Sequence, residues 1–221
     1  VSVDADQIEA RLAAHFSQDE GLKAAFLSDE DFFVHLARGI FRDPGLQKSD
    51  KRRQLTKGVV YGKLYGAGPE TMAKTAKVPF EQMVEVVNGF DTTFPGVRML
   101  QKAIENVAYQ RKRETGEGFI ITPMGRRLPA DDEREYTLVN YLIQAHAAEI
   151  FKQNLVKLDA IGLGDYLMLP VHDEIVMDVP RDEGDEVLTL AIESMNDADN
   201  YFVPISWSGE VIDGAWGSKY E

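Results

Sequence analysis

The sequence predicts a mixed α+β fold, because strand-like segments lie near both ends of the chain and helical patterns fill its middle. Residues 1–4 alternate apolar and polar side chains like the end of a buried strand. Two apolar runs, at 166–171 and 174–179, flank a tight turn at His172-Asp173, and a last strand is expected over 203–211.

A series of helices is expected after the opening strand. Apolar residues at helical spacing from Gln7 predict a helix of about three turns. Shorter helices are expected over 20–27 and 30–41, the second started by Ser28-Asp29. Ser49 is the expected cap of a basic helix that ends near Gly66.

Proline and glycine mark the remaining boundaries. Pro79 and Pro95 each lie just inside the start of an expected helix, where the missing N–H is harmless. The helical pattern breaks at Gly116-Glu117-Gly118. The rest of the prediction is a hairpin of 119–121 with 127–128, a long helix over 132–161 and a helix over 182–196.

The formal net charge of the 221 residues is −13, which taken alone argues against a nucleic-acid-binding protein. The cations gather, however, in three islands at 48–63, 111–113 and 126–127. Such islands fit a polyanion site, and they also fit solvated helix faces. Composition therefore does not decide between these alternatives.

The absence of cysteine excludes disulfides and thiolate metal sites. No apolar stretch approaches the roughly 18 residues of a membrane span. Residues 1–4 show no secretory signal and no initiator methionine, so we expect a piece of a longer or processed polypeptide. A cytoplasmic protein without a membrane partner is expected.

Two acids occupy positions where a carboxylate is unusual. Asp4 closes an apolar strand, and Asp173 lies in the turn between two apolar strands. Carboxylates at strand ends can converge across a sheet, and their oxygens, completed by phosphate and water, suit Mg²⁺. Two such ions about 4 Å apart would serve phosphoryl transfer. Taken alone, each acid is better explained as a strand-ending or turn-forming residue.

A row of cations and aromatic rings is expected on the central basic helix. Arg53, Lys57, Tyr61 and Tyr65 follow one another at intervals of four residues and share one face. Such a row could bind a polyphosphate and then a sugar and base. For an isolated helix, solvated cations and core tyrosines explain the pattern better.

Three segments together resemble the motifs of family A DNA polymerases, the bacterial polymerase I type. Asp4-Ala-Asp-Gln-Ile-Glu-Ala-Arg11 is similar to motif A, usually Asp-Tyr-Ser-Gln-Ile-Glu-Leu-Arg. Residues 53–66 resemble motif B with every spacing kept, and Val171-His-Asp-Glu174 resembles motif C. Thr122-Pro-Met-Gly-Arg-Arg127 and residues 140–149 are similar to two further motifs, so five motifs occur in the family's order.

The resemblance implies a polymerase palm, an antiparallel sheet with helices, into which a mostly helical fingers subdomain is inserted. The palm would comprise residues 1–27 and 118–221, and the fingers residues 28–117. The motif B helix would span 49–66, and the motif C hairpin 166–179.

The thumb and any exonuclease would be absent from this chain. We therefore expect the missing thumb and palm segments to come from a longer polypeptide or from a partner chain. Without them, the first strand would lose its sheet neighbours and form an exposed edge.

The implied reaction is DNA-templated addition of deoxynucleoside triphosphates to a primer 3′ end with two Mg²⁺ ions, or Mn²⁺ in their place. Asp4 and Asp173 would bind the metal ions, with Glu174 beside them. Arg53 and Lys57 would hold the triphosphate. The sugar would meet Tyr61 and Glu9, and contacts to the nucleotide or to primer–template DNA are implied for Gln7, Tyr65, Arg127, Asn140, Gln144 and His172.

Four departures from the family pattern stand out. Asp6 would place a third acid beside the metal site, and Phe33 replaces a triphosphate-contacting histidine. Tyr136 stands where arginine is frequent, and Ala145-His146 replaces Gly-Thr. These changes indicate a divergent branch, such as a phage polymerase, which would act in the host cytoplasm.

A non-catalytic nucleic-acid-binding module on the same scaffold remains an alternative, because fold does not guarantee activity. Such a module would be expected to have lost Asp4, Asp173 or Lys57, and all three are present. A metal-dependent phosphodiesterase would also use two acids but would not need the row of residues 53–65.

Overall fold

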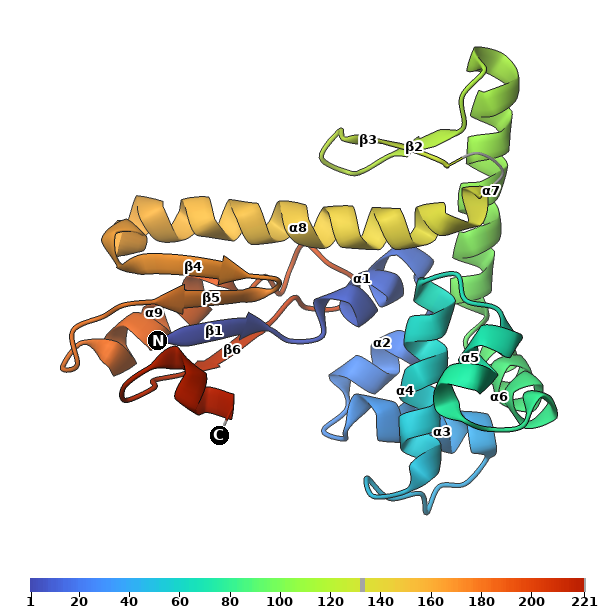
Figure 1. Ribbon diagram of the computed structural model, residues 1–221, viewed down its shortest axis with the longest axis horizontal. Helices are drawn as coiled ribbons and strands as arrows, with labels where there is room; N and C mark the ends of the chain where they lie inside the picture. The colour runs from blue at the N-terminus through green and yellow to red at the C-terminus, as the bar shows by residue number, and fades with distance from the viewer. Residues whose placement is uncertain (132–133, 221) are drawn as a thin grey trace. The chain divides into compact units, whose positions relative to one another are not determined.

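The computed structural model describes residues 1–131 and 134–220 (Figure 1). Helices and an antiparallel sheet occur together, which confirms the mixed α+β class. The chain divides into two compact units, the first formed by Val1–Arg11 and His146–Glu221 and the second by Leu12–Ala145.

The first unit is built on a four-stranded antiparallel sheet with the strand order β4-β5-β1-β6. Its strands are β1 (Ser2–Ala5), β4 (Leu167–Val171), β5 (Glu174–Met177) and β6 (Trp207–Glu210). β1 pairs with β5 on one side and with β6 on the other. The expectation of an exposed first strand is therefore wrong, because segments from the far end of the chain supply both neighbours.

The two faces of this sheet differ because strand residues alternate in direction. Val3 is fully buried on one face, together with Trp207 of β6. The helix α9 (Gly184–Met195) packs on β1 and β6. The helix α8 (Leu138–Leu158) contributes Phe151, whose ring lies 6.1 Å from the Trp207 ring. The opposite face carries the polar residues of β1.

The second unit is a block of helices with one small hairpin. Within it, α3 packs on α4, α5 on α6, and α7 on both α6 and the hairpin. Its elements are the second half of α1 (Ile8–Ser17), α2 (Glu20–Leu27), α3 (Phe32–Phe41), α4 (Lys51–Leu64), α5 (Pro69–Ala76), α6 (Phe80–Thr93), α7 (Pro95–Thr115), the hairpin β2 (Phe119–Ile121) and β3 (Arg127–Pro129), the 3₁₀ turn η1 (Glu135–Thr137) and the first turns of α8.

A buried carboxylate ties two helix starts of this block together. Asp19 caps α2 by accepting a hydrogen bond from the Leu22 N–H, at 3.1 Å. Its second oxygen accepts from the N–H of Gly96, in the first turn of α7, at 2.8 Å. A β-carbon on Gly96 would lie 2.8 Å from this carboxylate, so the contact requires glycine.

Two helix caps differ from the prediction by one to three residues. α3 is capped by Asp31 rather than Ser28-Asp29, and α4 by Asp50 rather than Ser49. In both cases a carboxylate accepts a backbone N–H of the first turn, where the helix dipole favours a negative charge.

The prolines mark helix starts, although not all in the predicted way. Pro95 is the first residue of α7, as predicted, whereas Pro79 is the residue before α6. The prediction omitted α5, which starts at Pro69 after Gly68 and so carries the same signal.

The second half of the chain follows the predicted order of elements. The hairpin at 119–129 and the turn at 172–173 are confirmed. The predicted start of the long helix at Asp132 lies outside the described residues, and α8 is observed from Leu138. The last strand is shorter than predicted, because only an isolated bridge between Asp197 and Ile205 precedes β6.

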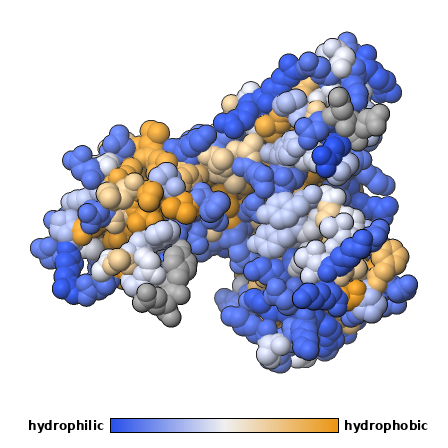
Figure 2. All heavy atoms as spheres, in the orientation of Figure 1, coloured by the Kyte–Doolittle hydropathy of each residue, from blue (hydrophilic) through white to orange (hydrophobic). Residues whose placement is uncertain are grey.

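Hydropathy separates the parts of the surface. Figure 2 shows hydrophobic side chains gathered over the first unit and a mainly hydrophilic surface over the helices of the second. Met168 and Leu169, on the edge strand β4, are exposed apolar side chains. Within residues 1–131 and 134–220, no helix has the length and apolar character needed to cross a membrane.

Candidate functional site

Two acids meet where β1 ends. The turn between β4 and β5 lies beside β1, and the Ala5 N–H donates a hydrogen bond to the Asp173 carbonyl oxygen at 3.1 Å. On β1, Asp4 pairs directly opposite Glu174 of β5. The structure thus brings Asp4, Asp173 and Glu174 together, although about 170 residues separate Asp4 from the other two in the sequence.

The Asp4 carboxyl is electrostatically strained in this setting. Partial burial raises its pKa, and the neighbouring Asp173 raises it further, whereas Lys219 opposes both effects. A bound cation would relieve such repulsion, so the donor set fits Mg²⁺, which prefers carboxylate oxygens. Among the described residues, no group of three or more His, Cys, Asp or Glu is arranged to hold a metal ion.

Glu174 is buried and held by several donors. Its Oε1 atom accepts hydrogen bonds from Trp216 Nε1 at 3.0 Å and from Lys219 Nζ at 2.9 Å. The Ser2 hydroxyl donates to the same oxygen. Trp216 and Lys219 belong to the short helix η4 (Trp216–Tyr220), which was not predicted from the sequence. The sequence indicates such a partner only indirectly. Glu174 adjoins Asp173, and a buried acid beside another acid needs a cation.

Asp6 has two hydroxyl partners that the sequence did not indicate. Its two carboxylate oxygens accept hydrogen bonds from the hydroxyls of Ser206 and Ser208, at 2.8 and 2.6 Å. The Asp6 carbonyl oxygen also accepts from Arg11 Nε at 2.6 Å. The Asp6 carboxylate is thus bound to the start of β6, and its expected place beside the metal site stays a prediction.

Three further predicted residues flank the acids on the first unit. Gln7 has a φ of 51° and is exposed where β1 turns into α1. Glu9 lies in the first turn of α1 and is half-buried. His172, with a φ of 56°, is exposed in the turn that precedes Asp173. The left-handed backbone at Gln7 and His172 is uncommon for residues with a β-carbon.

The predicted row of side chains is present on α4 of the second unit. The Tyr61 and Tyr65 rings are nearly parallel, with centroids 6.3 Å apart. Phe33 of α3 lies against this row, 5.6 Å from Lys57 Nζ and 5.7 Å from the guanidinium carbon of Arg53, both measured to the ring centroid. Both cations therefore lie near the ring of Phe33, which the sequence analysis noted only as a replacement of the family's histidine.

Arg53 has an acidic partner that the sequence did not reveal. Its guanidinium donates to both carboxylate oxygens of Asp31, at 2.8 and 2.7 Å. Asp31 also caps α3, so one carboxylate joins the start of α3 to α4. The hydrogen bond from Arg53 lowers the pKa of Asp31, and Asp31 raises the pKa of Arg53.

The C-terminal end of α4 is closed by a tight contact. Gly66 has a φ of 72°, and a β-carbon there would lie 3.0 Å from the Tyr136 ring. Tyr136, the residue that departs from the family's arginine, therefore lies against the last turn of motif B. Part of its side chain stays exposed.

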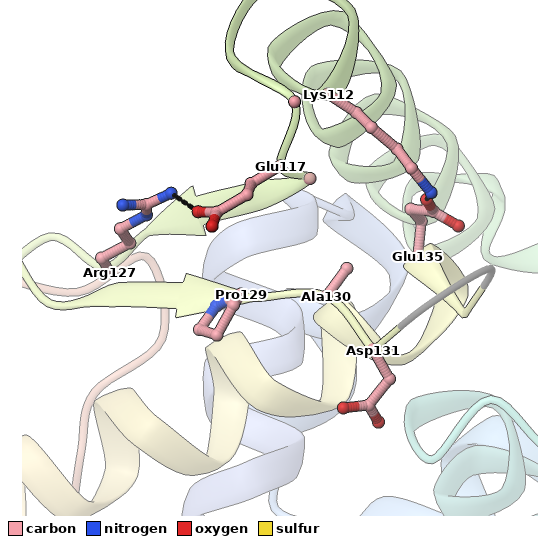
Figure 3. Close-up of a pocket in the computed structure, with 9 residues that line it drawn as sticks. Lys112, Glu117, Arg127, Pro129, Ala130, Asp131 and Glu135 are labelled. Atoms are coloured by element: carbon pink, nitrogen blue, oxygen red, sulfur yellow. Dashed lines mark hydrogen bonds and ion pairs between the residues drawn. The ribbon is translucent and has the colours of Figure 1, made fainter.

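Arg127 is positioned by the hairpin rather than projecting freely (Figure 3). Its guanidinium carbon lies 4.0 Å from the centroid of the Phe119 ring, and its Nη2 atom forms an ion pair with Glu117. An adjacent pocket of about 450 Å³ is also lined by Lys112 and Glu135, which form an ion pair of 2.9 Å. About half of the Arg127 side chain remains exposed.

On α8, Asn140 and Gln144 lie one turn apart and share a face, with Gln144 exposed and Asn140 half-buried. His146 is buried, and its two ring nitrogens face the Glu149 carboxylate at 3.2 Å and the Tyr201 hydroxyl at 3.3 Å. The Ala145-His146 departure therefore places a polar network inside the first unit.

Enzymes that transfer nucleotidyl groups use paired carboxylates to hold metal ions and cationic side chains to bind phosphates. The first unit carries such a pair of acids, and α4 of the second unit carries such cations. A family model described as DNA polymerase family A matches residues 1–217. The chain belongs to this family.

Individual relatives agree with that assignment. The chain is 36% identical to the DNA polymerase of Mycobacterium phage D29 over 223 aligned residues, covering 99% of this chain and 35% of that protein. It is 31% identical to the thermostable DNA polymerase I of Thermus thermophilus, covering 93% of this chain and 25% of that protein.

A solved structure, the POL domain of Pol1 from M. smegmatis in complex with DNA primer-template and dNTP, superposes with a TM-score of 0.81 at 28% identity. The match covers 94% of this chain and 38% of that one. The chain thus spans about a third of the length of the phage D29 polymerase and a quarter of the length of the Thermus thermophilus polymerase.

Proposed function

We propose that this chain carries the palm and fingers of a DNA-directed DNA polymerase, which adds deoxynucleoside triphosphates to a primer 3′ end. The observation that carries the proposal is the meeting of the motif A and motif C acids, Asp4 and Asp173, at one sheet end of a family A chain. The palm would comprise 1–27 and 118–221, and the fingers 28–117.

In this proposal the acids of the first unit hold the catalytic ions. Asp4 and Asp173 would bind two Mg²⁺ ions, or Mn²⁺ in their place. Bound there, the ions would activate the primer hydroxyl and stabilise charge on the leaving oxygen. Burial and the repulsion from Asp173 together raise the pKa of Asp4, and a bound cation would relieve that repulsion.

The residues of α4 would bind the incoming nucleotide. Arg53 and Lys57 would compensate the negative charge of the triphosphate, which grows on the leaving group in the transition state. Because Asp31 already holds the Arg53 fork by both oxygens, the guanidinium is pre-oriented before a phosphate arrives. Tyr61 would stack on the sugar and Tyr65 would lie near the templating base.

The remaining residues would contact nucleotide or DNA. Glu9 would press on the 2′ position of the sugar and exclude ribonucleotides. The phage relatives and the solved complex with primer-template DNA and dNTP support these assignments by homology. Gln7 would contact the nucleotide and the primer–template. Further contacts to the primer–template would come from Arg127, Asn140, Gln144 and His172.

Primer extension by the full-length protein that contains this chain tests the proposal. Asp173→Asn should lower the extension rate about a hundredfold or more, because one metal-binding charge is lost. Asp182→Asn, which changes an exposed acid in the turn before α9, should leave the rate unchanged. Extension that survives Asp173→Asn would contradict the metal assignment, and template binding without any extension would favour the non-catalytic alternative.

A further inference from the structure

The short helix η4 contacts the polar face of the first unit's sheet, on which Ser2, Asp4 and Glu174 lie, through the side chains of Trp216 and Lys219. Lys219 of η4 places its ammonium 2.9 Å from Glu174 Oε1 and 2.9 Å from the Ser2 hydroxyl. Trp216 donates to the same glutamate oxygen at 3.0 Å. Three donors from two segments therefore converge on one oxygen atom.

The Lys219 ammonium offsets the repulsion between the acids at this end of the sheet. Glu174 pairs directly across from Asp4 and adjoins Asp173, and like charges placed opposite one another destabilise a sheet. The Lys219 and Glu174 side chains are only 20% and 9% exposed, so their attraction is weakly screened by solvent. Lys219 also lies 3.9 Å from Glu210 on β6, which is more exposed.

The ion pair also decides how many carboxylates a metal ion meets. An unpaired Glu174 would add a third negative charge beside Asp4 and Asp173, and divalent ions bind more tightly as the number of charged ligands rises. Because its Oε1 atom accepts hydrogen bonds from three donors, Glu174 lies beside the metal site without serving as a metal ligand.

We propose that Lys219 is a positioning residue. Its ion pair keeps Glu174 beside the site without letting it bind metal, so that the catalytic ions bind through Asp4 and Asp173 alone. This inference rests on the proposed function. In this role η4 keeps metal binding weak. The nucleotide and primer, rather than a third carboxylate, would then determine where the ions bind.

Binding of Mn²⁺ to the full-length protein without nucleotide, followed by electron paramagnetic resonance of the free ion, tests this inference. Lys219→Met keeps a long unbranched side chain and removes its charge. It should tighten Mn²⁺ binding about fivefold, as expected for losing one cation near a divalent ion. The same variant should slow primer extension, because the ions then bind away from their productive positions.

Three further variants make the result specific. Lys219→Arg should bind Mn²⁺ like the wild type, because the charge is kept. Arg181→Met, which breaks an exposed ion pair with Asp213, should also leave Mn²⁺ binding unchanged. Combining Lys219→Met with Glu174→Gln should return the affinity to the wild-type value, because the freed carboxylate is gone.

Unchanged or weaker Mn²⁺ binding by a folded Lys219→Met variant would overturn the inference, as would tightening that persists in the double variant. If thermal melting shows that Lys219→Met does not fold, Trp216→Phe provides the second test. It removes one neutral donor to Glu174 and should tighten Mn²⁺ binding about twofold. Unchanged binding by Trp216→Phe would then count against the role of η4.

The wild-type protein separates this inference from the proposed function. If it neither binds Mn²⁺ nor extends primers, the proposed function fails and takes this inference with it. If it does both while the Lys219 variants behave like the wild type, only the role of Lys219 is overturned.

Discussion

At the scale of single residues, the cations expected to bind a triphosphate already have partners. Arg53 is held by both oxygens of Asp31, and Lys57 lies over the Phe33 ring. A guanidinium held in this way loses less conformational entropy when a phosphate binds. The pair is also a measurable contribution to stability, because its side chains are only 21% and 22% exposed.

The Asp31–Arg53 pair gives stability a defined pH dependence. Because the folded-state pKa of Asp31 is lowered, its contribution is present above the unfolded pKa of about 3.9 and is lost as the pH falls through the folded value. Asp31→Asn keeps the helix cap but not the ion pair. At pH 7 it should lower the melting temperature by about 2–4 °C, equivalent to about 1 kcal/mol after solvent screening.

Melting curves between pH 3 and pH 8 provide the measurement for Asp31→Asn. The difference from the wild type should shrink below about pH 4. Asp29→Asn, which changes an exposed acid two residues away, is the matched control and should melt like the wild type. An Asp31→Asn effect that is equally large at pH 3 would show that the ion pair is not its cause.

Tyr61 is expected to govern the choice between deoxy- and dideoxynucleotides. The family resemblance implies that a tyrosine here, where many relatives have phenylalanine, tolerates a sugar without a 3′ hydroxyl. Tyr61→Phe should therefore reduce dideoxynucleotide incorporation relative to deoxynucleotides by about tenfold, the worth of one hydroxyl hydrogen bond to a charged partner. Competitive incorporation on one primer–template measures the ratio, and an unchanged ratio would refute the assignment.

Residues that share a helix face were predictable, whereas their long-range partners were not. The four-residue spacing of residues 53–65 is enough to align them on α4. Nothing in that spacing shows that Asp31 binds Arg53 or that Lys219 binds Glu174, because these pairs depend on how distant segments pack. Asp6 illustrates the same limit, since its two serine partners lie about 200 residues further along the chain.

At the scale of elements, two glycines of α4 have different surroundings. A β-carbon on Gly62 would lie 2.7 Å from the sulfur of Met72 on α5, whereas a β-carbon on Gly58 would meet nothing within 4 Å. The two residues are one turn apart and share the same helical backbone. Gly62 therefore permits close packing of α4 on α5, and Gly58 does not have that role.

Alanine substitutions should separate these two roles. Gly58→Ala should stabilise the protein by about 0.5–1 kcal/mol, because alanine favours a helix interior. Gly62→Ala gains the same propensity but must displace Met72, and overpacking costs about 1–3 kcal/mol. Chemical denaturation of both variants measures the difference. Equal stability of the two variants would mean that Met72 moves aside without cost.

Helix boundaries were predictable to within a few residues where a capping residue or proline marks them. α2 was predicted with its observed bounds, and α7 starts at the predicted Pro95. The errors at α3 and α4 arose because several capping residues adjoin one another, and only the packed structure selects Asp31 and Asp50. β6 is short for a similar reason, since its length depends on pairing with β1.

At the scale of the whole molecule, the fold class followed from the order of strands and helices, but the sheet topology did not. The order β4-β5-β1-β6 inserts the first strand between two segments from the last third of the chain. A sequence read alone gives no register for such pairing. The meeting of Asp4 and Asp173 could therefore be proposed from the family resemblance, whereas local sequence patterns alone do not imply it.

The charge distribution of the whole chain predicts weak DNA binding by residues 1–221 on their own. The net charge is −13, and cations of the basic islands are already engaged: Arg52 with Asp43 and Asp50, Arg127 with Glu117. Phosphate contacts supply most of the affinity for DNA. We therefore expect a dissociation constant above about 1 μM for a primed template at 150 mM salt.

Fluorescence anisotropy with a labelled primer–template at several salt concentrations measures this affinity. The phage relatives are about three times as long as this chain, so a full-length protein should bind at least about tenfold more tightly through additional phosphate contacts. Its affinity should also fall more steeply with salt, because more counterions are released. Nanomolar binding by residues 1–221 alone would contradict the prediction and would mean that the basic islands exchange their acidic partners for phosphates. Arg127→Gln should then weaken binding and reduce the salt dependence.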